Sequence, residues 1–267
     1  MPLTLVPTPI GNLEDITLRA LRVLREADLI ACEDTRTSGI LLKHYNIKKP
    51  LTSFHVHNEN EKLNFLLEKL RDGENIAVIS DAGTPGISDP GWILLKRAIE
   101  ENIKIDVLPG ASAVVPAVLM SGINPQPFLF LGCPPEKSAE RIKLLNEIKN
   151  FPFTLCFYIS PHKIEKDLID FLEILGDRKA ALVREISKIF QEAIRENLSN
   201  LISRLKEGIK GELVLIIEGF NHEIFNNEEW KEEAKKLFDD GSSVKDVVKI
   251  IGEKYKIPKN EIKKVIF

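Results

Sequence analysis

A stretch rich in glycine, proline and acidic residues, Ser80–Gly91, limits most strongly what this chain can fold into. An apolar run, Ile76–Ile79, precedes it and an amphipathic run, Trp92–Ile99, follows it, which predicts a buried strand, a tight loop and a helix. In open α/β sheets, ligands bind at the loop after a strand's carboxyl end. This loop has twelve residues, whereas such connections usually have about two to six. The stretch therefore predicts a ligand-binding loop rather than a simple solvated connection.

Similar strand–loop–helix patterns occur elsewhere in the first half of the chain. Apolar runs at Leu3–Val6, Leu29–Cys32 and Ile105–Leu108 are each followed by a loop and a predicted helix. The loop after the second run, Glu33–Ser38, holds carboxylates, an arginine and hydroxyls. These residues fit a functional site and a cluster of helix-capping residues equally well.

Composition places the chain among ordinary globular proteins. It has 267 residues, a net charge of −3, 43% hydrophobic residues and 29% charged residues, enough length for one large domain or two smaller ones. No global excess of positive charge indicates nucleic acid, although a local basic face could still bind RNA. No apolar run is long enough to span a membrane, and the N-terminus lacks the pattern of a signal peptide.

The cysteines and histidines predict no metal site. The three cysteines are far apart, which argues against a zinc site or a disulfide framework and favours a reducing, cytoplasmic setting. His55 and His57 could offer two metal ligands, but a polar loop is the favoured interpretation because no third ligand is near in sequence.

Proline residues near the middle of the chain mark a linker, Asn124–Pro127. We expect an N-terminal α/β domain at 1–123, a linker at 124–127, a C-terminal α/β domain at 128–221 and a helical tail at 222–267. From Gly241 to Phe267 the tail has seven lysines against three acidic residues. It could contact phosphates, or it could be a solvated helical cap.

Four motifs together resemble one known family. They are Val6–Thr17 (VPTPIGNLEDIT), Glu33–Arg36 (EDTR), Ser80–Gly91 (SDAGTPGISDPG) and Arg184–Lys188 (REISK). The chain is similar over nearly its whole length to the ribosomal RNA small subunit methyltransferase I family, within the tetrapyrrole methylase superfamily. The resemblance implies two α/β domains with S-adenosylmethionine in the cleft between them. It also implies methyl transfer to the ribose 2′-hydroxyl of a cytidine in the decoding region of 16S rRNA, by a homodimer acting on the small ribosomal subunit.

Matching the motifs residue by residue gives the positions that the resemblance implies for the cofactor. These are Pro9, Ile10, Ala82, Gly83, Thr84, Ile87, Ser112, Ala113, Ile159, Ile186 and Leu213. Two positions depart from the family pattern. Ile159 stands where the family usually has a glutamate, and Glu136 stands in a run that usually carries an arginine.

Polar residues at predicted strand ends are the candidates for chemistry. A ribose hydroxyl is a weak nucleophile, so a positioned base should help. The candidate bases are Glu33, Asp34, Asp81 and Glu185, with Lys188 as a further candidate if burial lowers its pKa. Arg36 and Arg184 are expected to hold phosphate. Asn12, His55, His57 and Asn58 are expected to contact the substrate nucleotide.

Two other functions stay open at this point. One is a methyltransferase that acts on a tetrapyrrole or another small molecule. The other is a protein that binds RNA or an adenosyl ligand without catalysis, which the isoleucine at position 159 leaves possible.

Overall fold

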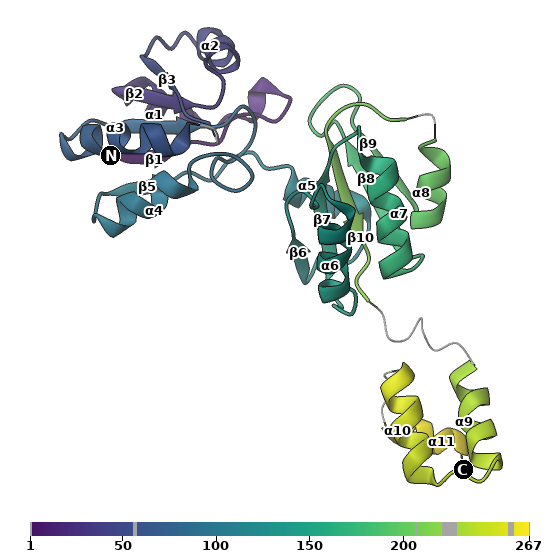
Figure 1. Ribbon diagram of the computed structural model, residues 1–267. Coiled ribbons are helices and arrows are strands. Elements are labelled where there is room, and N and C mark those ends of the chain that lie inside the picture. The colour runs from purple at the N-terminus through teal and green to yellow at the C-terminus, as the bar shows by residue number, and fades with distance from the viewer. Residues whose placement is uncertain (1, 56–57, 207, 221–228, 256–258, 267) are drawn as a thin grey trace. The chain divides into compact units, whose positions relative to one another are not determined.

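The computed structural model describes residues 2–55, 58–206, 208–220, 229–255 and 259–266 (Figure 1). The chain divides into two compact units, one of residues 1–148 and 153–218, and one of residues 149–152 and 219–267. The first unit holds two five-stranded sheets, and the second is helical. None of the described helices is long and apolar enough to cross a membrane.

The first sheet is parallel and has the order β3-β2-β4-β1-β5. Its strands are β1 (Leu3–Leu5), β2 (Leu29–Cys32), β3 (Leu51–Ser53), β4 (Ile76–Ile79) and β5 (Ile105–Val107). Because β1 and β4 are neighbours and parallel, the loops that follow them leave the same edge of the sheet side by side.

Helices cover both faces of this sheet, as the fully buried β2 and β4 require. Residues alternate between the faces along each strand. Leu29 and Ala31 pack with α3 (Glu59–Arg71) and α4 (Trp92–Glu100). Ile30 and Cys32 pack with α1 (Leu18–Glu26) and α2 (Thr35–His44), and a short 3₁₀ helix, η1 (Leu13–Asp15), precedes α1.

The second sheet is mixed and has the order β6-β7-β10-β8-β9. Its strands are β6 (Phe128–Phe130), β7 (Thr154–Ile159), β8 (Lys179–Arg184), β9 (Glu192–Asn197) and β10 (Leu213–Ile217). One face packs on α6 (Ser138–Ile148), α7 (Ile164–Leu175) and α8 (Leu198–Arg204). The other packs on α5 (Val114–Ser121).

The four strands and the one helix given bounds from the sequence lie within one residue of them, and the α/β fold class is confirmed. Thr17 caps α1 as its position suggests, since its hydroxyl accepts a hydrogen bond from the Ala20 N–H at 3.0 Å. One boundary is wrong by four residues. The helix expected after the Glu33–Ser38 loop begins at Thr35 instead, because Asp34 caps it by accepting the Arg36 N–H at 2.8 Å. The boundaries of the predicted domains stay a prediction.

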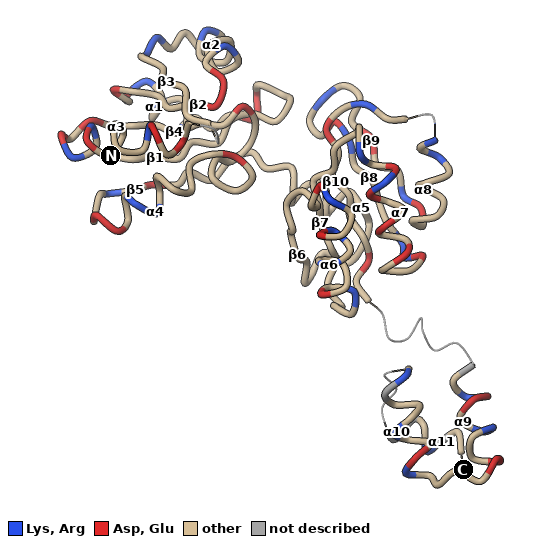
Figure 2. Tube along the Cα trace, in the orientation of Figure 1, with Lys and Arg blue, Asp and Glu red and all other residues tan. Residues whose placement is uncertain are grey.

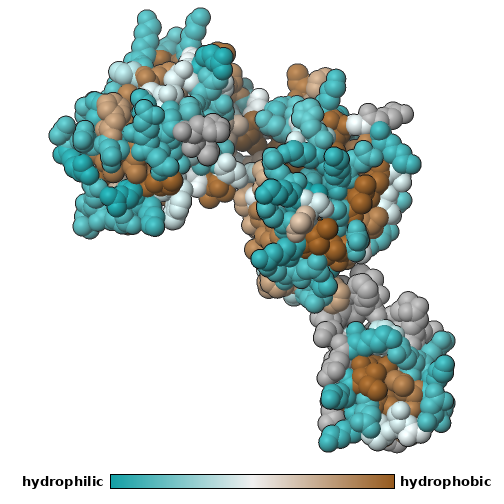
Figure 3. Space-filling model, viewed as in Figure 1, coloured by the Kyte–Doolittle hydropathy of each residue, from teal (hydrophilic) through white to brown (hydrophobic). Residues whose placement is uncertain are grey.

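The helical unit contains α9 (Glu229–Asp239), α10 (Val244–Tyr255) and α11 (Lys259–Ile266), as expected of a helical tail. Trp230, Val247 and Ile262 are among the residues of its small core, and Figure 3 shows apolar side chains gathered in the middle of this unit with hydrophilic ones around them. Figure 2 shows both signs of charge on its helices. Lys254, for example, pairs with Glu233 at 2.7 Å.

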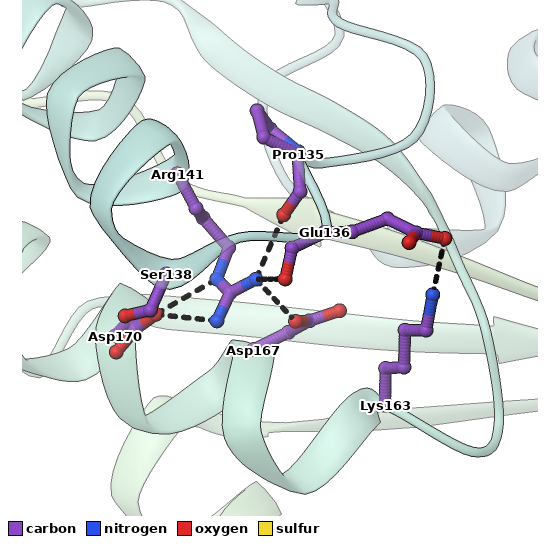
Figure 4. Close-up of polar contacts among 7 residues, drawn as sticks. All are labelled: Pro135, Glu136, Ser138, Arg141, Lys163, Asp167 and Asp170. Atoms are coloured by element: carbon purple, nitrogen blue, oxygen red, sulfur yellow. Dashed lines mark hydrogen bonds and ion pairs between the residues drawn. The ribbon is translucent and has the colours of Figure 1, made fainter.

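A buried arginine joins α6 to α7 and to the loop before α6 (Figure 4). The Arg141 side chain is 4% exposed and pairs with Asp170 at 2.6 Å and with Asp167 at 3.1 Å. It also donates to the backbone carbonyl oxygens of Pro135 and Glu136 at 2.8 and 3.2 Å. This buried guanidinium therefore has two carboxylates and two backbone carbonyl oxygens as partners.

Replacing Arg141→Met should destabilise the protein by about 3–5 kcal/mol, because it leaves two buried carboxylates without their cation. Denaturant unfolding measures the loss. The control is Lys137→Met, which removes a surface pair with Glu140 and should change the free energy of unfolding by less than about 1 kcal/mol. Equal unfolding midpoints for the two variants would contradict the role given to Arg141.

Candidate active site

Backbone hydrogen bonds join the loops that follow β1 and β4. The Thr8 N–H donates to the Gly83 carbonyl oxygen at 2.9 Å, and the Gly83 N–H donates to the Thr8 carbonyl oxygen at 3.0 Å. The Thr8 hydroxyl also donates to the Ser80 carbonyl oxygen at 3.0 Å. The two loops therefore form one short double-stranded wall at the carboxyl edge of the sheet.

The rest of the 80–91 loop is held at two further points. The Thr84 hydroxyl donates to the Ala111 carbonyl oxygen at 3.1 Å. Gly91, whose φ of +129° suits glycine, precedes α4 and has no side chain to cap it. The buried Glu59 carboxylate accepts the Gly91 N–H at 3.0 Å instead. The long loop is thus ordered by contacts that its own sequence does not reveal.

A cavity of about 680 Å³, the main cavity, opens on one side of this wall. Its lining comes from the loops after β1 and β4, the start of α5, and β6, β7 and β10. Ten of the eleven residues predicted to bind the cofactor line it: Ile10, Ala82, Gly83, Thr84, Ile87, Ser112, Ala113, Ile159, Ile186 and Leu213. Pro9, the eleventh, lines a smaller cavity of about 280 Å³, the side cavity.

Burial raises the pKa values of Asp89, Tyr158 and Cys133 in the main cavity. Burial, and next the charge of Asp81, raise the pKa of Asp89, although a hydrogen bond with Ser80 opposes the shift. Burial raises the pKa of Tyr158 to about 12, so its hydroxyl stays protonated and can donate a hydrogen bond. Asp89 is thus a carboxylate whose pKa is raised by burial in a largely apolar pocket.

The chain resembles known proteins over nearly its full length. The model of the tetrapyrrole (corrin/porphyrin) methylases matches residues 2–202. A protein named ribosomal RNA small subunit methyltransferase I from Bacillus subtilis is 41% identical, over 97% of this chain and 92% of the relative. One of the same name from Pasteurella multocida is 48% identical over 81% and 79%. The chain belongs to the ribosomal RNA small subunit methyltransferase I family of tetrapyrrole methylases.

The fold agrees with that membership. The crystal structure of a diphthine synthase superposes with a TM-score of 0.62 at 15% identity, covering 81% of this chain and 89% of that one. This likeness concerns the fold alone. Members of the tetrapyrrole methylase family use S-adenosylmethionine, and the chain is a methyltransferase that depends on this cofactor.

The lining of the main cavity suits that cofactor. Apolar side chains such as Ile10 and Ile186 offer surfaces for an adenine ring. Asp89 and Glu212 bring carboxylates to the lining, which favour the positive charges of a sulfonium and an amino group. The cavity volume falls within the range of about 300–1,000 Å³ that is usual for a ligand of this size.

None of the six predicted catalytic residues lines the main cavity. Asp34 instead caps α2 and pairs with Arg36 at 2.7 Å, which lowers the pKa of Asp34 to about 2. The capping interpretation of this cluster therefore has direct support. Glu33 is half-buried, and burial, followed by the charge of Asp89, raises its pKa. Asp81 lies in the lining of the side cavity.

Glu185 and Lys188 form an ion pair that Glu212 extends, and a part for either in proton transfer stays a prediction. The Lys188 ammonium contacts Glu185 at 3.0 Å and Glu212 at 3.2 Å. Although burial lowers its pKa, these partners outweigh burial and the pKa of Lys188 is raised. The condition under which this lysine could act as a base is therefore not met. The Glu212 N–H, and next the lysine, lower the pKa of Glu185.

The residues expected to contact the substrate have structural partners of their own. Asn12 caps η1 by accepting the Glu14 N–H. Asn58 accepts the His55 N–H at 2.8 Å and donates to Ser53, so it ties its loop together. Arg184 donates to Glu192 at 2.9 Å. His57 lies outside the described residues. Contact of the others with substrate stays a prediction.

The two departures from the family pattern lie in ordered surroundings. Ile159 is buried at 5% exposure and pairs in register with Leu213, opposite it in β10. Its place is apolar and inside the cavity lining, so no acid is available there. The Glu136 carboxylate pairs with Lys163, and its carbonyl oxygen accepts a hydrogen bond from Arg141 (Figure 4).

Sequence reasoning passed over several residues of the site. Asp89 belongs to the long acidic loop, but the sequence does not mark it as a site residue. Nothing in the sequence points to Tyr158, Glu212 or Glu59. The signal for Asp89 is its place in the same motif as Ala82–Thr84, since a loop that folds back brings both ends to one cavity. Glu59 carries no such signal, because its partner is a backbone N–H of a distant segment.

We expect Lys188→Arg to keep the transfer rate within about threefold and Lys188→Met to lower it by tenfold or more. Arginine preserves the cation that joins Glu185 to Glu212, whereas methionine leaves two carboxylates facing each other. Steady-state methyl transfer measures both variants. Loss of activity in Lys188→Arg with cofactor binding intact would instead favour proton transfer by the lysine, because arginine cannot be deprotonated in proteins.

Proposed function

We propose that the chain transfers the methyl group of S-adenosylmethionine to the ribose 2′-hydroxyl of a cytidine in the decoding region of 16S rRNA. The observation that carries this proposal is the main cavity, whose lining contains the motif residues that the family resemblance implied for the cofactor. The names of the relatives, at 41% and 48% identity, support ribosomal RNA of the small subunit as the acceptor. The likeness to diphthine synthase, at 15% identity, does not bear on the acceptor.

S-adenosylmethionine supplies an electrophilic methyl group when it is bound. The residues that would hold it are the apolar and small residues of the main cavity, with Asp89 and Glu212 toward its positive charges. The wall made by Thr8 and Gly83 fixes the loops on which alignment depends. A largely apolar lining excludes water from the reacting centre.

Asp89 is our proposed proton acceptor. It lines the main cavity, and its raised pKa brings it nearer to the ribose hydroxyl in basicity than an ordinary aspartate. Ser80 holds it by a hydrogen bond, and Ser80 belongs to the wall that faces both cavities. The Tyr158 hydroxyl in the same lining stays protonated and can orient an oxygen of the acceptor.

The first experiment uses tritiated S-adenosylmethionine and small ribosomal subunits from a strain that lacks this activity, with nuclease mapping of the label. We expect label at one ribose of a cytidine in the decoding region. Calorimetric titration of the cofactor runs beside it as a control for a folded site. Cofactor binding without any label in subunits or in naked 16S rRNA would overturn the proposed acceptor.

Asp89→Asn should lower the transfer rate by about 10²–10⁴-fold, the range for loss of a positioned base, and raise the cofactor Kd by much less than that factor. Because the pKa of Asp89 is raised, activity is complete at high pH and declines as pH falls through that raised value. The acidic decline should therefore begin above the ordinary range of an aspartate, and the variant should lose it. Glu100→Gln, a surface change on α4, is the control. A variant that keeps the wild-type pH profile would exclude Asp89 as the base.

We also propose that two copies of the chain associate and that they act in the cytoplasm, where small subunits are assembled. Support for the dimer comes from the family resemblance. Light scattering at working concentration tests it, and a monomeric mass would contradict it.

A further inference from the structure

The side cavity shares the Thr8–Gly83 wall with the main cavity. Neighbouring residues of each loop line different cavities. Pro9 and Gly11 line the side cavity, whereas Ile10 lines the main cavity. In the other loop the division falls at one point: Ser80 and Asp81 line the side cavity, and Ala82 and Gly83 line the main cavity. Only the segment from Pro9 to Gly11 alternates as extended backbone does, with successive residues on opposite faces.

The lining of the side cavity is mixed, and two of its apolar side chains are exposed. Its polar members are Thr37, Ser38, His44, Ser80 and Asp81. Ile40 on α2 is 74% exposed and Leu13 is 39% exposed, while Pro9 behind them is buried. The cavity, at about 280 Å³, lies just below the usual volume of pockets for drug-sized ligands. A single flat ring would cover these side chains and fit the space.

Two polar groups of the cavity are available to such a ring. Ser38 is 2% exposed, and its buried hydroxyl has no oxygen or nitrogen partner among the described residues, although the weakly bonding Cys32 thiol lies near it. Asp81 accepts the Asp34 N–H at 3.2 Å through one carboxylate oxygen. Its second oxygen can accept from a ligand. A buried hydroxyl normally has an oxygen or nitrogen partner, and a ligand seated deeply enough to reach Ser38 would supply one.

We propose that the side cavity holds the base of the target cytidine, with Asp81 accepting from its exocyclic amino group and Ser38 bonded to its ring nitrogen or carbonyl oxygen. This inference rests on the proposed function. Sequence-specific proteins read RNA mostly through unstacked bases, which they hold against apolar or aromatic surfaces and bond along the pairing edge. Enzymes that modify a nucleotide commonly place its base in a pocket of this kind.

The two polar groups distinguish cytosine from uracil. Cytosine presents an amino donor where uracil presents a carbonyl acceptor, and an ionised carboxylate bonds the first and repels the second. With the base in the side cavity, its ribose lies at the shared wall. There the backbone of Ser80 and Gly83 is fixed by Thr8, and Ser80 bonds Asp89. The arrangement separates base recognition from cofactor binding by one pair of loops.

The test compares small subunits that carry cytidine or uridine at the mapped target position. For the wild-type enzyme we expect kcat/KM to favour cytidine by about tenfold or more. Asp81→Asn should reduce this preference to within about threefold, because an amide can present either an acceptor or a donor. Ser38→Ala should raise KM for the cytidine subunits several-fold and leave the cofactor Kd unchanged. Glu100→Gln should keep the wild-type preference.

Failure of the inference differs from failure of the proposed function. A wild-type preference retained in Asp81→Asn, together with an unchanged KM in Ser38→Ala, would overturn the base site while transfer to rRNA stands. A purine at the labelled position would overturn the base site as well. Cofactor binding without transfer to any rRNA would remove the proposed function and this inference with it. Cofactor titration of each variant shows that it is folded.

Discussion

The reciprocal hydrogen bonds between Thr8 and Gly83 are the constraint on which the site depends. Strand order makes them possible, because β1 and β4 are parallel neighbours and their loops start side by side. Loops of this length carry many backbone donors and acceptors that must be satisfied. Pairing them with each other satisfies two of each and holds the two irregular segments together. The two cavities then lie on different sides of this paired segment, and each is lined by residues of both loops.

The order of elements could be predicted from the sequence because the first sheet is covered on both faces. A strand such as Ile76–Ile79 must then be apolar throughout, and the glycines and prolines after it mark its end. The prediction was least accurate where a side chain had two possible uses. Asp34 reads equally well as a site residue and as a cap, and only the bond to the Arg36 N–H shows that it starts α2 four residues early.

The candidate site could be predicted only in part, and the limit is physical. Small and apolar residues that line a cavity lie within continuous motifs, so the resemblance located ten of them together. The chemistry of an ionisable group depends on distant partners that no local pattern reveals. Lys188 follows Glu185 closely in sequence, yet Glu212 from another strand also holds its proton. No cation is among the causes of the shift in the pKa of Asp89, and burial, the largest of these causes, raises that pKa.

The distribution of charge places phosphate binding and the choice of nucleotide on different surfaces. Of the residues described around the main and side cavities, none is lysine or arginine. The cavities therefore suit a base, a ribose and a cofactor and offer a phosphate no lysine or arginine. Contacts of those residues with phosphate must come from outside them, for example from Arg36, whose side chain is 89% exposed although it pairs with Asp34. The affinity that comes from contacts with RNA phosphates would then fall as the salt concentration rises. The preference for one nucleotide, which is set in a cavity without lysine or arginine, would depend little on salt.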